Sequence, residues 1–183
     1  NDVFYGGRMK IAPNVIPFVK GNKPAIEWHP VNGYWQERTN HEEAQRVIEM
    51  VEDYLQQDVP PSLGIITFNV NQKNYILDLI DKRTQESPEF AALIEGNVQG
   101  DERDVIIFTT AYAPAHPGGR VQQHFGLLNQ PGGENRLNVA VTRAISRIHV
   151  ISSINPETDL NTSTSMHSGP KIFHKYLCYA KAV

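Results

Sequence analysis

The amino-acid sequence predicts an α/β fold, a parallel sheet sandwiched between helices. Short apolar runs alternate with runs of helical spacing, and this alternation is typical of strand–helix–strand units. Hydrophobic residues make up 40% of the 183 residues and charged residues 20%, which is enough apolar material for one sizeable core. We therefore expect residues 1–183 to form a single domain.

The first half of the chain predicts two strands and three helices. Residues 26–31 are a short strand that ends at an Asn-Gly turn. A helix then starts at Thr39, which can cap the amide three residues on, and two prolines stop it. Residues 62–69 are an apolar run suited to a buried strand. A helix over 71–83 and a shorter one after a Ser-Pro pair follow.

The second half predicts two more strands and two more helices. Residues 105–112 lack strict alternation, so we expect a central strand that is buried on both faces. Two glycine-rich turns precede a helix over 135–145, a strand over 147–154 and a closing helix over 171–181. In parallel sheets of this kind, ligands bind beyond the carboxyl ends of the strands.

Composition and motifs exclude several classes of protein. Lys and Arg total 17 against 20 Asp and Glu, so contact with nucleic acid would need a local groove and not a basic surface. The chain has no G-x-x-x-x-G-K-[ST] segment and hence no phosphate-binding P-loop of its own. The seven histidines show no metal-ligand spacing, and His116 and His124 have no cysteine nearby, so we predict no metal site.

The sequence also bears on location and completeness. No apolar run approaches the about 20 residues that a membrane-spanning helix needs, and no secretion signal is visible. We therefore expect a cytoplasmic protein without membrane contact. The chain begins with Asn1 and not with methionine, so we expect it to be a fragment of a longer protein.

Three segments carry side chains suited to chemistry, and the first is residues 135–144. At about 100° per residue, Arg136, Arg143 and Arg147 fall in one stripe beside an apolar arc. Guanidinium groups at such a boundary can bind a phosphate bidentately. An ordinary solvated helix face with salt bridges would give the same spacing.

The second segment is residues 97–104, directly before the predicted central strand. Its amides, glycine and carboxylates could hydrogen-bond a ligand, although a polar turn would explain them equally. The third segment runs from Thr67 to Asn69 and is followed by Gln72. A hydroxyl and amides at a strand end suit contact with a nucleic-acid backbone, but Asn69 could equally cap the next helix.

Taken in order, these segments resemble the second RecA-like domain of superfamily 1 DNA/RNA helicases, in the branch of the nonsense-mediated-decay helicase. The resemblance covers nearly the whole chain and is strongest to large bacterial helicase-like proteins. The matching segments are FYGGRMK at 4–10, NHEEA at 40–44, GIITFNVNQ (motif IV) at 64–72, VQGDERDVI (motif V) at 98–106 and NRLNVAVTRA (motif VI) at 135–144. In motif V the family usually has an aspartate and an aromatic residue where this chain has Gly96 and Val98.

The resemblance implies a RecA-like fold of the P-loop NTPase type, with ATP held between two such domains. The first domain would supply the P-loop and the metal-binding carboxylates, and hence most contacts to ATP and Mg²⁺. In the present domain Arg143 matches the arginine finger of motif VI, and Arg136 matches the first arginine of that motif. Glu102 matches a contact on the nucleotide side, and Gln99 and Gly100 belong to the same loop. A guanidinium on the γ-phosphate would stabilise charge in the transition state.

The resemblance also implies a single strand of DNA or RNA as a partner. Thr67 matches the motif IV position that contacts the nucleic-acid backbone, and we place Asn69 and Asn97 on the same side. The implied function is the C-terminal motor domain of an ATP-dependent helicase or translocase, inactive when isolated. The alternative is a catalytically inactive RecA-like scaffold or nucleic-acid-binding module.

Overall fold

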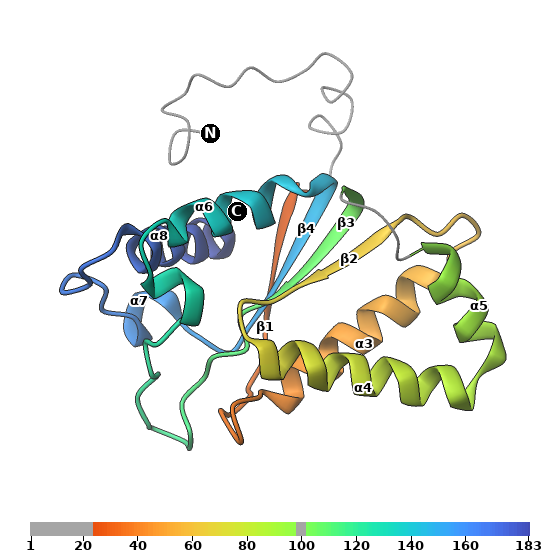
Figure 1. Ribbon diagram of the computed structural model, residues 1–183, viewed down its shortest axis with the longest axis horizontal. Helices are drawn as coiled ribbons and strands as arrows, with labels where there is room; N and C mark the ends of the chain where they lie inside the picture. Colours follow the sequence, from red (N-terminus) through yellow and green to blue (C-terminus); the bar gives the residue numbers. More distant parts are fainter. Residues whose placement is uncertain (1–23, 98–101) are drawn as a thin grey trace, which may run out of the picture.

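Residues 24–97 and 102–183 are described by the computed structural model, which has a central sheet between two layers of helices (Figure 1). Four parallel strands in this part of the chain form the sheet, in the order β1-β4-β3-β2. These strands are β1 (Ile26–Pro30), β2 (Leu63–Ile66), β3 (Arg103–Thr109) and β4 (Ala144–Ser152). The predicted α/β class with a parallel sheet is confirmed.

Strand β3 lies inside the sheet between β2 and β4, as predicted from its continuous apolar sequence. Its side chains alternate between the two faces. Val105 and Ile107 pack under one helical layer, and Ile106 and Phe108 pack under the other. All four side chains are at most 4% exposed. Because both faces of the strand are buried, its sequence is continuously apolar and does not alternate between apolar and polar residues.

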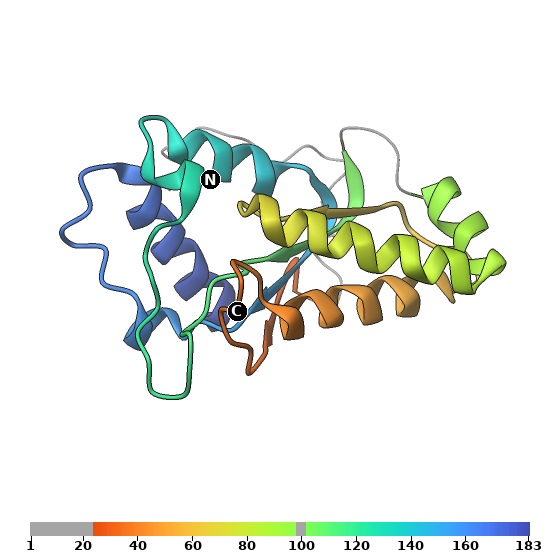
Figure 2. The same cartoon turned by 60° about the horizontal axis from the view of Figure 1, so that its bottom comes forward.

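Three helices cover the face toward Val105 and Ile107: α3 (His41–Leu55), α4 (Val70–Glu86) and α5 (Pro88–Asn97) (Figures 1 and 2). Helix α3 buries a stripe of apolar residues at helical spacing against the sheet. The stripe consists of Ala44, Val47, Ile48, Val51 and Leu55. Helix α4 packs beside α3, and α5 contacts both.

The start of α3 differs by one residue from the sequence prediction. Asn40 is the N-cap, and its Oδ1 accepts a hydrogen bond from the amide of Glu43 at 3.1 Å. The predicted cap, Thr39, instead closes a tight turn, where its hydroxyl donates to the carbonyl oxygen of Gln36 at 2.8 Å. Threonine and asparagine are both good helix caps, so two adjacent candidates could not be separated from the sequence.

The opposite face carries the 3-10 helix η1 (Gly126–Asn129) and the helices α6 (Gly133–Thr142), α7 (Pro156–Asp159) and α8 (Ser168–Ala182). Aromatic rings packed edge to face form the centre of this layer. Neighbouring centroids among Phe68, Phe108, Phe125 and Phe173 lie 5.2 to 6.4 Å apart. Among the described helices, none combines the length and apolar character needed to cross a bilayer.

Helix α6 ends earlier than predicted, and this changes the arginine pattern. The helix ends at Thr142 with Arg143 as its C-cap, and β4 begins at the next residue. Arg147 therefore lies in a strand and faces the α3 layer, where it approaches Glu27. The predicted stripe of three arginines was wrong because no glycine or proline marks the helix end, so the spacing continued across the boundary.

Candidate functional site

Glu102 and Arg143, which were predicted to contact a nucleotide, lie at neighbouring backbone positions at the amino edge of the sheet. Glu102 immediately precedes β3, and Arg143 immediately precedes β4. The two strands are paired at this point, because the amide of Arg103 donates to the carbonyl oxygen of Arg143 at 3.0 Å. Glu102 is exposed and Arg143 is half-buried. A carboxylate and a guanidinium are therefore carried by neighbouring backbone positions at one edge.

This is the opposite edge from the one that the general rule for parallel sheets predicts. That rule places ligands beyond the carboxyl ends of the strands. Glu102 and Arg143 instead stand before the first residues of their strands. Glu102 and Arg143 differ from this rule because each belongs to a segment that leads into its strand.

Arg103 holds the start of β3 in place. It is only 7% exposed, its Nε donates to the carbonyl oxygen of Leu63 at 3.0 Å, and its Nη1 donates to that of Glu102 at 2.9 Å. The guanidinium thus joins β2 to β3 and fixes the backbone of the residue that carries the exposed carboxylate. No local pattern in the sequence indicates this role of Arg103, because its partner in β2 is distant along the chain.

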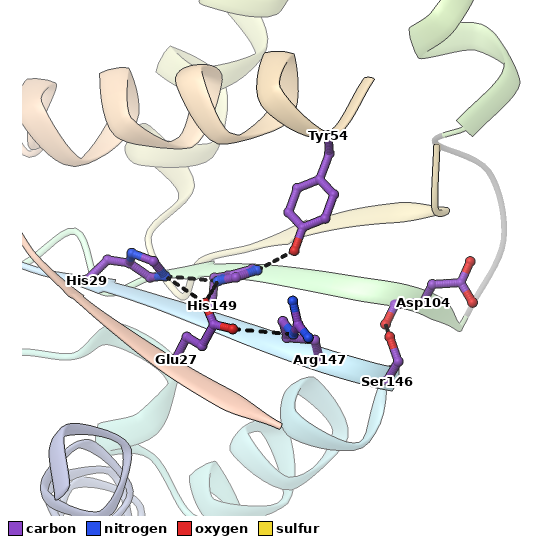
Figure 3. Close-up of polar contacts among 7 residues, drawn as sticks. All are labelled: Glu27, His29, Tyr54, Asp104, Ser146, Arg147 and His149. Carbon is purple, nitrogen blue, oxygen red and sulfur yellow. Dashed lines mark hydrogen bonds and ion pairs between the residues drawn. The ribbon is translucent and has the colours of Figure 1, made fainter. Parts of the chain in front are cut away.

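Asp104 adds a second set of bonds at the same edge. Its Oδ2 accepts hydrogen bonds from the amide of Ser62 at 2.9 Å and from the hydroxyl of Ser62 at 2.7 Å. The hydroxyl of Ser146 donates to the backbone carbonyl of Asp104 at 2.6 Å (Figure 3). The hydrogen bonds from Ser62 lower the pKa of Asp104. The amino ends of β2, β3 and β4 are therefore tied together beneath Glu102 and Arg143.

Arg136 lies on the exposed surface of α6, seven residues before Arg143. Seven residues are close to two helical turns, so both arginines lie on one side of the helix, about 10 Å apart along its axis. Gln99 and Gly100 lie outside the described residues, as does the segment 4–10. Asn97 is the last residue of α5.

Of the three predicted nucleic-acid residues, Thr67 and Asn69 lie at the other end of the sheet, whereas Asn97 ends α5 shortly before β3 and is not brought together with them. Thr67 directly follows β2 and is half-buried. Asn69 is the N-cap of α4, and its Oδ1 accepts from the amides of Asn71 at 2.8 Å and Gln72 at 3.0 Å. Helix capping, the alternative left open by the sequence, is therefore a role that Asn69 has.

Gln72 serves the interior of the protein. Its side chain is fully buried. Its Oε1 accepts from the amide of Asn40 at 2.8 Å, and its Nε2 donates to the carbonyl oxygen of Asn40 at 2.9 Å. Both backbone polar groups of that buried residue are thereby satisfied, and the starts of α3 and α4 are joined.

The carboxyl edge also contains a buried carboxylate, Glu43, in the first turn of α3. It accepts hydrogen bonds from the hydroxyls of Thr109 at 2.5 Å and Thr110 at 3.0 Å, and from the amides of Ala111 and Ser153, each at 2.7 Å. Burial raises the pKa of Glu43, and the hydrogen bonds oppose this by favouring the ionised form. One side chain thus connects α3 to the ends of β3 and β4.

The role of Glu43 was not predicted, although the sequence contains a signal for it. Asn40 and Glu43 have the spacing of a capping box, and the segment NHEEA was noted for its family resemblance. The strand ends that Glu43 binds lie 66 to 110 residues away along the chain. Their position could not be obtained from local spacing.

A RecA-like α/β domain in which Glu102 and Arg143 precede two paired strands and Thr67 follows a third fits a helicase-like class of protein. A family model described as AAA domain matches residues 2–155. The chain belongs to this family, the C-terminal helicase-like domain of superfamily 1 helicases. The resemblance inferred from the motifs is thereby confirmed.

Two curated relatives come from bacteria, and both are named uncharacterized ATP-dependent helicases. The protein from Mycoplasma genitalium is 37% identical over 168 residues, and its homologue from Mycoplasma pneumoniae is 36% identical over 168 residues. Each alignment covers 84% of this chain and 14% of the relative. The chain therefore spans only a small part of the length of these relatives.

Proposed function

We propose that this chain is the C-terminal motor domain of an ATP-dependent DNA or RNA helicase or translocase. In this proposal Arg143 is the arginine finger of an ATP site that a first RecA-like domain of the same protein completes. The observation that carries the proposal is the pairing of the strand starts that bear Glu102 and Arg143. The names of the two relatives support ATP-dependent helicase activity as the general class.

The residue types at the amino edge fit a nucleoside triphosphate. Guanidinium groups such as those of Arg136 and Arg143 bind phosphate oxygens through charge-assisted hydrogen bonds. The exposed carboxylate of Glu102 can accept a hydrogen bond from a ribose hydroxyl. Gln99 and Gly100 would belong to the same loop, while the first domain would hold Mg²⁺ and most of the nucleotide.

The hydrogen bonds at the amino ends of the strands support a fixed position for the backbone that carries Arg143. Arg103 and Asp104 tie the amino ends of three strands together. A guanidinium that stabilises transition-state charge must be held in place before the reaction, because reorganisation would cost part of the stabilisation. Arg143 lies at the junction of α6 and β4, where the backbone is fixed from both sides.

Nucleic acid would be bound through a different set of residues. Thr67 and Asn69 lie at the carboxyl end of β2, and Asn97 lies at the end of α5. Hydroxyl and amide groups of this kind contact phosphate and sugar without reading the base sequence. Closure and opening of the two RecA-like domains on ATP would then move the strand.

The test is Arg143→Ala in the full-length parent protein. Loss of an arginine finger is expected to lower the ATPase kcat by about 10³-fold or more, while nucleotide binding by the first domain is retained. The control is Arg46→Ala, which removes an arginine from the exposed side of α3, where it pairs with Glu49. The control should leave turnover near the wild-type value.

Unchanged turnover in Arg143→Ala would reject the arginine-finger role. If the parent also lacks a P-loop, that result would favour the catalytically inactive scaffold. The purified 183-residue chain is expected not to hydrolyse ATP, because the first domain is missing. Steady ATP hydrolysis that stays with this chain through purification would contradict an ATP site shared between two domains.

A further inference from the structure

Three side chains of metal-ligand type meet between β1 and β4, on the sheet face under α3 (Figure 3). Glu27 and His29 are two residues apart in β1, so their side chains leave the strand on the same face. His149 is the register partner of Glu27 in β4 and faces the same way. This cluster lies apart from Glu102 and Arg143, and neither motif V nor motif VI accounts for it.

The distances within the cluster suit a small divalent cation. Nε2 of His29 lies 2.8 Å from Nδ1 of His149, which lies 3.4 Å from Oε2 of Glu27. The remaining separation, from Nε2 of His29 to Oε2 of Glu27, is 3.9 Å. Ligand atoms bonded at 2.0–2.1 Å around a tetrahedral zinc ion are about 3.3 Å apart, and the three separations bracket this value.

We infer that Glu27, His29 and His149 form a binding site for Zn²⁺ or a cation of similar chemistry. Two histidines and one glutamate are an established zinc ligand set, with the fourth position open to water. Imidazole nitrogen favours zinc and its transition-metal neighbours, whereas Mg²⁺ and Ca²⁺ prefer oxygen ligands.

Two further side chains orient the ligands. Tyr54 contacts His149, and Arg147 contacts Glu27, in each case at the ligand atom that points away from the site. The hydroxyl of Tyr54 in α3 lies 2.6 Å from Nε2 of His149, so the ring presents Nδ1 to the other two ligands. Nε of Arg147 lies 3.4 Å from Oε1 of Glu27, which leaves Oε2 on the side of the histidines. Side chains that hydrogen-bond or ion-pair with metal ligands orient those ligands and tune the affinity of the site for the metal.

The site is shielded on one side and reachable on the other. The side chain of His149 is 4% exposed, whereas those of His29 and Glu27 are 22% and 26% exposed. Without a cation, the two imidazoles are hydrogen-bonded through the nitrogens that would bind it. A cation would replace the proton between them and would join the edge strand β1 to β4 and, through Tyr54, to α3.

The charges nearby set an expectation for affinity. Arg147 contacts the carboxylate, and Arg46 acts electrostatically on His29. Both repel a cation, and the single carboxylate of Glu27 balances only one of the two positive charges. We therefore expect binding to be weaker than at a four-ligand structural zinc site, and to be selective for Zn²⁺ over Mg²⁺.

The experiment uses the 183-residue chain after removal of metal with a chelator. Zn²⁺ is titrated by calorimetry, and Co²⁺ is titrated by its visible absorption, which is intense in tetrahedral sites. The expected result is one ion per chain, a tetrahedral Co²⁺ spectrum and a rise in the thermal unfolding midpoint on adding Zn²⁺. Mg²⁺ at the same concentration should give no rise.

Variants assign the ion to these ligands. His29→Gln is expected to lose saturable binding and the rise in midpoint, while His124→Gln, a change at an exposed histidine in a loop, should behave as the wild type. Tyr54→Phe should bind about 10–100-fold more weakly and keep the tetrahedral Co²⁺ spectrum. Glu27→Gln is the second ligand variant if His29→Gln does not fold, as judged by circular dichroism without metal.

Two results would overturn the inference. One is the absence of saturable one-to-one binding of Zn²⁺ to the wild-type chain. The other is a ligand variant that folds and binds Zn²⁺ with wild-type affinity, because the ion would then be held elsewhere. Neither outcome depends on ATP hydrolysis, so the test is independent of the function proposed for Arg143.

Discussion

At the scale of single residues, several polar side chains with long-range partners hold the motif residues in position. Glu43, Gln72 and Arg103 are each buried, and each bonds elements that are distant along the chain. All three lie in segments that carry the motif resemblance, but the resemblance did not predict a structural role for them. Their residue types are visible in the sequence, whereas their partners depend on the tertiary fold.

Glu43→Gln is expected to destabilise the domain strongly. Oε2 of Glu43 accepts from the amide of Ala111, and Oε1 accepts from that of Ser153. A glutamine amide would therefore point its NH₂ group at a backbone N–H in either orientation. We expect the free energy of unfolding in urea to fall by about 2–4 kcal/mol.

The matched control for this change is Glu42→Gln, at the exposed neighbouring position. It should alter the free energy of unfolding by less than about 0.5 kcal/mol. A neutral effect of Glu43→Gln would mean that Glu43 is a protonated donor in the folded state and not an ionised acceptor.

Asp104 gives the fold a dependence on pH. Hydrogen bonds from Ser62 lower its pKa below the ordinary aspartate value of about 4, so the folded state binds the proton less tightly than the unfolded chain. The ionised carboxylate therefore stabilises the fold above that ordinary value, and the stabilisation is lost as the pH falls through the lowered pKa.

Asp104→Asn should accordingly cost about 1 kcal/mol of unfolding free energy at neutral pH. The difference from the wild type should shrink as the pH falls below about 4. Urea unfolding of the wild type and the variant across that pH range measures the difference in their unfolding free energies. Other groups titrate alike in both proteins, so their contributions cancel in the difference. A difference that stays constant with pH would exclude the carboxylate as its source.

At the scale of elements, the starts of α6 and α8 meet at η1. A Cβ atom on Gly133 in α6 or on Gly169 in α8 would overlap the carbonyl oxygen of Leu128. Both helices therefore depend on glycine for their close approach. The position of α6 matters for the site because Arg136 and Arg143 lie on and at the end of this helix.

Gly169→Ala is expected to destabilise the domain by about 1–3 kcal/mol, the usual cost of overpacking a tight contact. Thermal or urea unfolding measures the loss. Gly118→Ala is the comparison, because open space surrounds Gly118 and only its positive φ of 71° is strained. If Gly169→Ala costs no more than Gly118→Ala, the contact between the helices is looser than the structure indicates.

The elements differ in how well the sequence predicted them. Helix α3 was predicted closely because apolar spacing and two prolines define its body and its end. The end of α6 was missed because helical spacing continued through Arg143 to Arg147 without a breaker. The edge at which Glu102 lies was predicted, since residues 97–104 directly precede a strand, whereas the pairing of that strand with the one after Arg143 depends on the tertiary fold.

At the scale of the whole molecule, the chain accounts for one helicase-like domain. It covers 14% of the length of its two relatives, and the proposed ATP site requires groups from outside this domain. The amino edge that carries Glu102 and Arg143 would therefore face another domain in the complete protein. The cluster of Glu27, His29 and His149 lies between β1, β4 and α3, so its chemistry is contained within this domain.

The strand order has a consequence for synthesis on the ribosome. Of the strands described, β1 is the first to be synthesised, yet its neighbour in the sheet is β4, the last of them. Contacts between residues so distant in sequence form late, because the intervening loop must close first. Until residue 152 has left the exit tunnel, the segment that forms β1 therefore lacks its partner in the sheet, and its apolar side chains lack their native packing.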